Sequence, residues 1–222
     1  MSNEEALAAV LLVLENDEIA EIDFHWGNRH ITPRVYRQVQ EAIAAGHIEV
    51  VHADQADSSS YFSQQDRIAL QHTDTESIPR RAMIVHEATH AGCDLRRWQM
   101  DVGNSESIAY LAQCIYARAQ TDNPVVMRLQ SSTAQNDDVF DQAWHMAEDV
   151  LERGVNRWTE DADHLLFLIE GHPWYEEEAA DSAVYYGLHR LDAQVARARA
   201  ATASEPAAGP SMGLHRRPAM GR

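Results

Sequence analysis

The sequence predicts an α+β fold, with a small mixed lobe at the N-terminal side and a mainly helical half after it. Apolar and polar residues alternate over 19–26, and β-branched residues are frequent over 48–52, as is typical of strands. From residue 79 onward the apolar residues recur every three or four positions, which indicates helices. The expected sheet is therefore short and confined to the N-terminal lobe.

The N-terminal lobe is expected to alternate helices and strands. Nine apolar residues at 6–14 predict a short packed helix, because acidic residues flank them where a signal peptide would carry basic ones. A Thr-Pro pair at 32–33 begins a helix that Gly46 ends. Residues 61–72 predict a further strand or hairpin, of which 67–72 is the most regular part.

The helical half is expected to begin near Pro79 and to be divided by Gly and Pro residues. A second helix should start at Asn104 or Ser105 and fade near Thr121. Three more are predicted over 137–153, 159–170 and 174–200. The chain is thus expected to form one domain over 1–198, with the mixed lobe over about 1–78, the helical part over 79–198, and a disordered tail over 199–222.

Composition excludes several classes of function. The formal net charge is −17, which argues against binding to nucleic acid or to an anionic membrane surface, because phosphate binding needs clustered cations. No stretch approaches the roughly 20 apolar residues of a membrane span. Two cysteines, Cys93 and Cys114, do not make a disulfide framework and suggest a reducing compartment. We therefore expect a cytoplasmic protein, with export that needs no signal peptide left open.

One pentapeptide, His-Glu-Ala-Thr-His at 86–90, carries the clearest chemistry. On a helix His86 and His90 lie one turn apart on the same face, where two imidazoles can bind one tetrahedral zinc ion. Glu87 lies beside them, close enough to take a proton from water at the metal. Random placement in a chain of this composition gives roughly 0.05 matches to the motif, so its surroundings matter. Uncharged residues flank it, and buried His and Glu side chains are costly there without a metal.

The next expected helix offers a third ligand. Glu106 would lie in the first turn of that helix, after a turn at Gly103 that lets the two helices fold against each other. A carboxylate there can complete a zinc site that keeps one open position. Asp94 and Asp101 are the alternatives for the third ligand.

These two segments together resemble the gluzincins, zincin metallopeptidases in which a Glu on a following helix joins two His ligands. Glu106, Ala109 and Tyr110 match the E-x-x-A-Y pattern of that family. The resemblance covers roughly residues 66–120. Only 15 residues separate His90 from Glu106, which is short for the family, so the turn between the helices must be tight.

The resemblance implies a zincin-like fold and a zinc cofactor held by His86, His90 and Glu106. It implies that Glu87 is the general base and that the reaction is hydrolysis of peptide bonds in a peptide or protein substrate. By the same resemblance, the strand at 67–72 would form the rim of the cleft and pair with an extended substrate.

The residues after His90 distinguish the chain from the metzincins. That pattern would place Gly at 93 and His at 96, where this chain has Cys93 and Arg96. Cys93 lies on the ligand face of the helix, so one interpretation is contact with the metal. The other is a small buried residue that, like Gly92, lets the Glu106 helix come close.

A second donor is expected near the metal to stabilise the oxyanion. Tyr110 lies one turn past Glu106 on the same helix face. It either donates to the oxyanion or packs beneath the site and orients a ligand. More distant candidates are Tyr116, His145, His164 and His172.

Three classes of function follow from these observations. The first is a zinc-dependent peptidase of gluzincin type. The second is a zincin-fold protein that binds metal and acts as a binding or scaffolding module with little or no peptidase activity. The third is a helical interaction domain in which the pentapeptide at 86–90 is accidental. Metal content separates the third class from the other two, and the activity of a Glu87→Gln variant separates the first two.

Overall fold

The computed structural model describes residues 2–53, 59–128, 134–158, 160–173, 175, 182–183, 187–189 and 192–194. These residues form helices and small sheets together, which confirms the predicted α+β class. The predicted tail at 199–222 lies outside the described residues. Among the described residues, none of the helices combines the length and apolar character needed to cross a bilayer.

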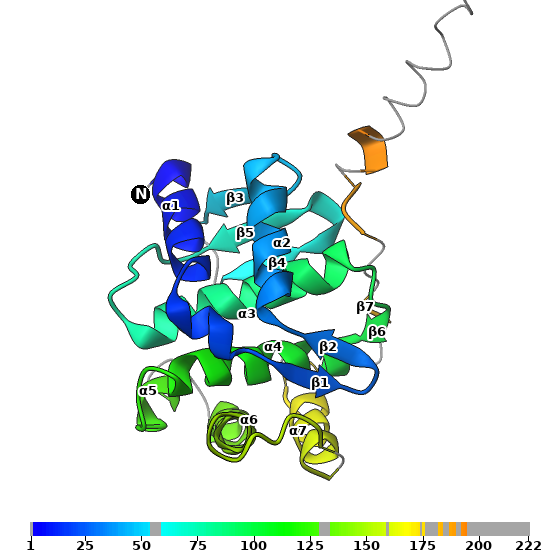
Figure 1. Cartoon of the computed structure of the whole chain (residues 1–222). Helices are drawn as coiled ribbons and strands as arrows, with labels where there is room; N and C mark the ends of the chain where they lie inside the picture. Colours follow the sequence, from blue (N-terminus) through cyan, green and yellow to red (C-terminus); the bar gives the residue numbers. More distant parts are fainter. Residues whose placement is uncertain are drawn as a thin grey trace, which may run out of the picture.

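The N-terminal lobe contains helix α1 (Asn3–Leu14) and a three-stranded sheet of β3 (Glu49–His52), β4 (Ser60–Phe62) and β5 (Arg67–Leu70). The strand order is β3-β5-β4, with β5 parallel to β3 and antiparallel to β4. Helix α1 begins with a capping box between Ser2 and Glu5 and packs on β3. The predicted helix at 6–14 and the predicted strand at 48–52 are thereby confirmed (Figure 1).

The predicted strand over 19–26 is mostly wrong. Residues Asp17–Glu21 form a 3-10 turn, η1, and only β1 (Phe24–Trp26) is extended. β1 pairs antiparallel with β2 (Arg29–Ile31) across a turn in which Gly27 has a φ of +57°. Ile19 and Ile22 are buried three residues apart, which fits one helical turn as well as it fits a strand. The short apolar pattern did not discriminate between the two.

Helix α3 (Ile78–Leu95) crosses the centre of the molecule, between the N-terminal lobe and the other helices (Figure 1). It packs on α2 (Pro33–Ala44) on one side and on α4 (Val102–Arg118) on the other. Helix α4 starts earlier than predicted. Asp101 is its N-cap and accepts the backbone N–H of Asn104 at 2.6 Å, so neither Asn104 nor Ser105 is the cap and Glu106 lies in the second turn.

The remaining helices cover the far side of α4. They are α5 (Val125–Arg128), α6 (Ala134–Arg153) and α7 (Glu160–Glu170), of which α6 and α7 lie close to the predicted positions. The predicted helix over 174–200 falls largely outside the described residues. Where it is described, Ser182–Ala183 forms a strand, β7, that pairs antiparallel with β6 (Met100–Asp101), so the prediction is wrong there.

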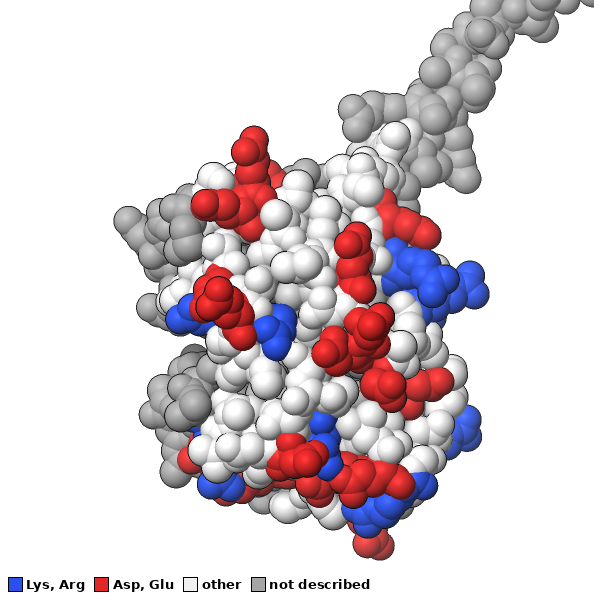
Figure 2. All heavy atoms as spheres, turned by 60° about the vertical axis from the view of Figure 1, so that its left-hand side comes forward, with Lys and Arg blue, Asp and Glu red and all other residues white. Residues whose placement is uncertain are grey.

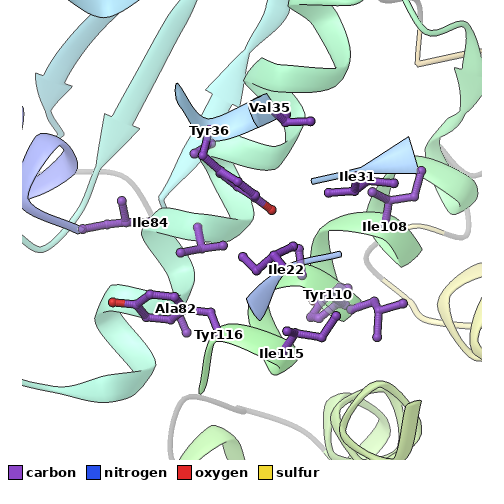
Figure 3. Packing of buried hydrophobic residues seen from close by; sticks show 14 of the residues in the cluster. Ile22, Ile31, Val35, Tyr36, Ala82, Ile84, Ile108, Tyr110, Ile115 and Tyr116 are labelled. Atoms are coloured by element: carbon purple, nitrogen blue, oxygen red, sulfur yellow. The ribbon is translucent and has the colours of Figure 1, made fainter. Parts of the chain in front are cut away.

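The core lies where η1, the β1–β2 hairpin, α2, α3 and α4 meet. Figure 3 shows their apolar side chains packed together, with Tyr36 of α2 directed into this core. A Cβ atom added to Gly92 would lie 2.2 Å from Val35 Cγ1 of α2. The small residue at 92 therefore brings α3 close to α2, and not to the Glu106 helix as the sequence suggested.

The acidic composition is visible on the surface. Figure 2 shows Asp and Glu side chains spread over one face, with fewer arginines between them. On this face the acidic side chains thus outnumber the arginines, in line with the formal net charge of −17.

Candidate metal centre

Two buried histidines of α3 face one point. His86 and His90 are 5% and 7% exposed, and their rings meet edge to face with centroids 4.8 Å apart. The two Nε2 atoms are 3.1 Å apart. Four residues of helix place them one turn apart on a single face, as the motif predicted.

Helix α4 brings Glu106 to the same point. One carboxylate oxygen of Glu106 lies 3.2 Å from His86 Nε2 and the other lies 3.3 Å from His90 Nε2. Ligand atoms of a tetrahedral zinc ion with bonds of about 2.0–2.1 Å are about 3.3 Å apart. His86, His90 and Glu106 thus form a group with the spacing of a metal site.

The outer nitrogens of the two rings determine what the inner nitrogens offer. His86 Nδ1 lies 2.9 Å from Oε1 of Gln113, which can only accept, so Nδ1 carries the proton and Nε2 presents a lone pair. His90 Nδ1 lies 2.9 Å from Oγ of Ser105, a hydroxyl that can accept the same proton. With both outer nitrogens protonated and no proton on the inner ones, the centre gathers two imidazole nitrogens and two carboxylate oxygens, and this donor set fits a zinc ion.

Electrostatics keep Glu106 ionised. Burial by itself would raise the pKa of this carboxyl group, but the positive charge of the His90 and His86 rings when they are protonated, and the hydrogen bonds that they then donate, outweigh burial and lower it far below its usual range. Glu106 is therefore a carboxylate at all ordinary pH values. A negative ligand held beside two imidazoles increases the attraction for a cation.

Glu87 lies next to the group. It is 4% exposed, and burial raises its pKa to about 7, with Glu106 adding to the effect and His86 opposing it. Its carboxyl group also accepts the backbone N–H of Tyr61, on β4. A carboxyl group with a pKa near neutrality, beside a metal site, suits the exchange of protons.

Two tyrosines contact the group, and the sequence indicated only one of them. The ring of Tyr110 packs edge to face on His86, with centroids 4.9 Å apart. The hydroxyl that reaches the carboxylate belongs instead to Tyr175, which donates to Glu106 Oε2 at 3.1 Å and lies 3.4 Å from the Tyr110 hydroxyl. Burial raises the pKa of both phenols, so both remain protonated donors.

The two aspartates considered as alternative third ligands form hydrogen bonds elsewhere. Asp94 accepts the hydroxyl of Tyr61 at 2.8 Å and the backbone N–H of Gly187 at 3.0 Å, whereas Asp101 caps α4. Cys93 is buried, and burial raises the pKa of its thiol to about 12, so it stays a neutral thiol. The structure therefore brings Glu106, and neither aspartate, to the two histidines.

The more distant donor candidates do not join the group. Tyr116 is buried, and its hydroxyl accepts from Asn16 at 2.7 Å. His164 is exposed and pairs with Gln142. His172 is buried, and its ring packs against that of Tyr175 with 5.7 Å between the centroids. The predictions for these residues as oxyanion donors gain no support from their positions.

His145 belongs to a second cluster, with Asp149 of α6 and Asp161 of α7. His145 is exposed and Asp149 is 7% exposed. Asp149 is paired with Arg153 through Oδ1 and accepts Trp158 Nε1 at 3.3 Å through Oδ2. This cluster already contains its own cation and its own N–H donor.

The predicted role for the strand at 67–72 is wrong. β5 is the central strand of the sheet and is paired on both sides, so it has no free edge for a substrate. The outer strand beside α3 is β4, at residues 60–62. The resemblance assigned this role to 67–72 as the strand before the helix of the two histidines, but its regular apolar pattern reflects burial and not access.

Three contacting residues were missed at the sequence level. Gln113 follows Glu106 by seven residues, two helical turns, so the helix periodicity contained this signal. Ser105 directly precedes Glu106, and its position indicated a helix cap but not its contact with His90 Nδ1. Tyr175 reaches the site through a turn after α7, and no local pattern predicts that path.

Comparisons with known proteins gave no match. No protein-family model, curated protein or solved structure is detectably similar to the chain.

Proposed function

We propose that this chain is a zinc-dependent metallopeptidase of gluzincin type, with a zincin-like fold, that hydrolyses peptide bonds. The observation that carries the proposal is the convergence of His86 Nε2, His90 Nε2 and the Glu106 carboxylate at spacings of 3.1–3.3 Å. Glu87 supplies a base beside them, and Gln113 and Ser105 orient the two rings.

Zinc, when bound by these three residues, supplies Lewis-acid chemistry that activates water and polarises a carbonyl group. Glu87 takes the proton from the attacking water and passes it to the nitrogen of the leaving amine. The burial that raises its pKa to about 7 favours both halves of this transfer near neutral pH. His86 and His90 hold their Nε2 atoms toward the site because their Nδ1 atoms are engaged.

Tyr175 is the best-placed donor to the oxyanion. Its hydroxyl lies beside the ligand carboxylate and is less enclosed than that of Tyr110, which packs on His86. Tyr110 then acts as a support for His86 and for the Tyr175 hydroxyl.

An extended peptide would lie beside β4, the outer strand that packs against α3, and so close to Glu87.

The test is a Glu87→Gln variant of the full chain, assayed with a fluorescence-quenched peptide library and analysed for zinc. We expect activity to fall by about 10³-fold while zinc is retained, since the change removes the base and keeps the ligands. Glu41→Gln, an exposed change on α2, is the matched control and should behave as wild type. Zinc binding with no cleavage by the wild type would instead favour a metal-binding module without peptidase activity.

A further inference from the structure

A general base is useful only if its carboxylate is held in place. Strand β4 contacts Glu87 through the backbone N–H of Tyr61. In an antiparallel pair every second residue directs its N–H away from the partner strand, and Tyr61 uses that free direction for Glu87. The position of the base therefore depends on the position of β4.

β4 itself is a weakly held element. It has three residues, Ser60–Phe62, and lies at the outside of the sheet with β5 as its neighbour. Phe62 is 45% exposed, so apolar packing of this strand is incomplete. Three residues of one-sided pairing contribute little rigidity, so β4 needs another anchor if it is to fix a catalytic group.

The side chain of Tyr61 supplies that anchor. Its hydroxyl donates to Oδ2 of Asp94 at 2.8 Å. Asp94 is 1% exposed and is itself fixed, because its Oδ1 accepts the backbone N–H of Gly187 at 3.0 Å. A charge-assisted bond to a buried carboxylate is among the stronger hydrogen bonds in proteins.

The spacing of the two carboxylates explains why one tyrosine serves both. Asp94 follows Glu87 by seven residues of α3, so the two lie on one face of the helix and about 10 Å apart. Tyr61 bridges them, with its backbone N–H at Glu87 and its phenol hydroxyl at Asp94. The helix that carries the base thus also carries the group that fixes the strand above it.

We propose that Tyr61 and Asp94 are positioning residues for Glu87: Asp94 holds the Tyr61 ring, and the Tyr61 N–H holds the base. This inference rests on the proposed function, since it assigns Glu87 the role of base. Neither residue touches the substrate through its side chain. Their effect is to limit the orientations of the Glu87 carboxylate.

The physical tether is tested by hydrogen exchange at the backbone amide of residue 61, followed by NMR. Tyr61→Phe keeps that amide and removes only the hydroxyl. We expect its exchange to become at least tenfold faster than in wild type, because the strand loses its anchor. Tyr36→Phe is the control: it removes a buried hydroxyl that faces Thr89 of the same helix at 2.9 Å, and it should leave residue 61 protected. Unchanged protection in Tyr61→Phe overturns the proposal, whether or not the chain is a peptidase.

The catalytic meaning is tested by kinetics on the best-cleaved peptide of the library. Tyr61→Phe should lower kcat about tenfold with KM within about twofold and zinc content unchanged, whereas Tyr36→Phe should keep kcat. Asp94→Asn should lower kcat similarly, and the double variant should be no worse than the stronger single one, since both act through one tether. Additive losses, or a change confined to KM, contradict a positioning role. If the wild type cleaves no peptide of the library, the proposed function is contradicted instead.

Discussion

Among the described residues, two groups of His and carboxylate side chains have ligand atoms close enough to share an ion, but they differ in what else they contact. At His86, His90 and Glu106 the facing atoms are two imidazole nitrogens and two carboxylate oxygens, and both rings are buried. At Asp149 and its neighbours, Arg153 and Trp158 already donate to the carboxylate, and His145 is exposed.

Proximity of possible ligand residues therefore does not by itself define a metal site. The first group holds two imidazole nitrogens and a carboxylate around one point, where burial limits their solvation, and this arrangement favours a cation between them. The second is balanced by an arginine and open to solvent. We therefore expect zinc at the first group alone, and the following changes test that contrast.

The largest effect is expected at the residues that orient the rings. Gln113→Leu removes the acceptor that fixes the His86 tautomer, so zinc affinity should fall about 10–100-fold. Gln142→Leu is the matched change near the second group, where Gln142 faces His164 Nδ1 at 3.1 Å, and it should leave zinc affinity unchanged. Competition with a chromogenic chelator measures both. If the two variants bind zinc with equal affinity, zinc does not bind at the first group in preference to the second.

Each group also has an aromatic donor to its carboxylate. Tyr175→Phe removes the hydroxyl beside Glu106 and should lower kcat about tenfold, because the oxyanion loses its donor. Trp158→Phe removes the N–H that reaches Asp149 and should not change kcat. Steady-state kinetics on a single cleaved peptide compares them. If Tyr175→Phe keeps full kcat, Tyr110 becomes the remaining candidate donor.

Glu87 should cost the metal-free protein stability at neutral and higher pH. Its pKa is about 7 when folded, against 4.5 as the ordinary value, so the folded state holds its proton over a range where the unfolded chain has lost it. Stability is therefore lost as pH rises from about 4.5 through 7. Glu87→Gln should be more stable than wild type by about 1–3 kcal/mol at pH 8, and this gain should vanish near pH 4.

Urea unfolding in the presence of a chelator measures that difference across the pH range. Glu41→Gln is the control, and its difference from wild type should stay flat with pH. A Glu87→Gln gain that is the same at pH 4 and pH 8 would show that titration of Glu87 is not its source.

The smallest effect is expected at Asp149. Asp149→Asn weakens the pair with Arg153, whose side chain is 54% exposed, so the loss of stability should stay within about 1 kcal/mol. Zinc content should not change. A measurable drop in zinc stoichiometry would show that the second group also binds the ion.

The centre of the molecule could be predicted from sequence because it depends on helix periodicity. His86 and His90 are four residues apart, and Gln113 follows Glu106 by seven, so one helical repeat defines both faces. The predicted start of this helix was wrong, because Asp101 is its cap. Glu106 still lies on the expected face, since an earlier start moves the helix boundary and does not rotate the residues that follow.

The surroundings of the site could not be predicted, because they depend on long-range contacts. Tyr175 meets Glu106 across 69 residues, and Gly187 meets Asp94 across 93. The outer position of β4 depends on a parallel pairing between β3 and β5 that no local pattern encodes. Short segments such as 19–22 remain ambiguous, since one turn and one short strand bury similar residues.

The most direct test of the central claim is the zinc content of the purified full chain, beside Glu106→Ala and His145→Ala. We predict one zinc per chain in wild type and in His145→Ala, and almost none in Glu106→Ala. If Glu106→Ala retains stoichiometric zinc with wild-type affinity, the two helices do not build the site described for them.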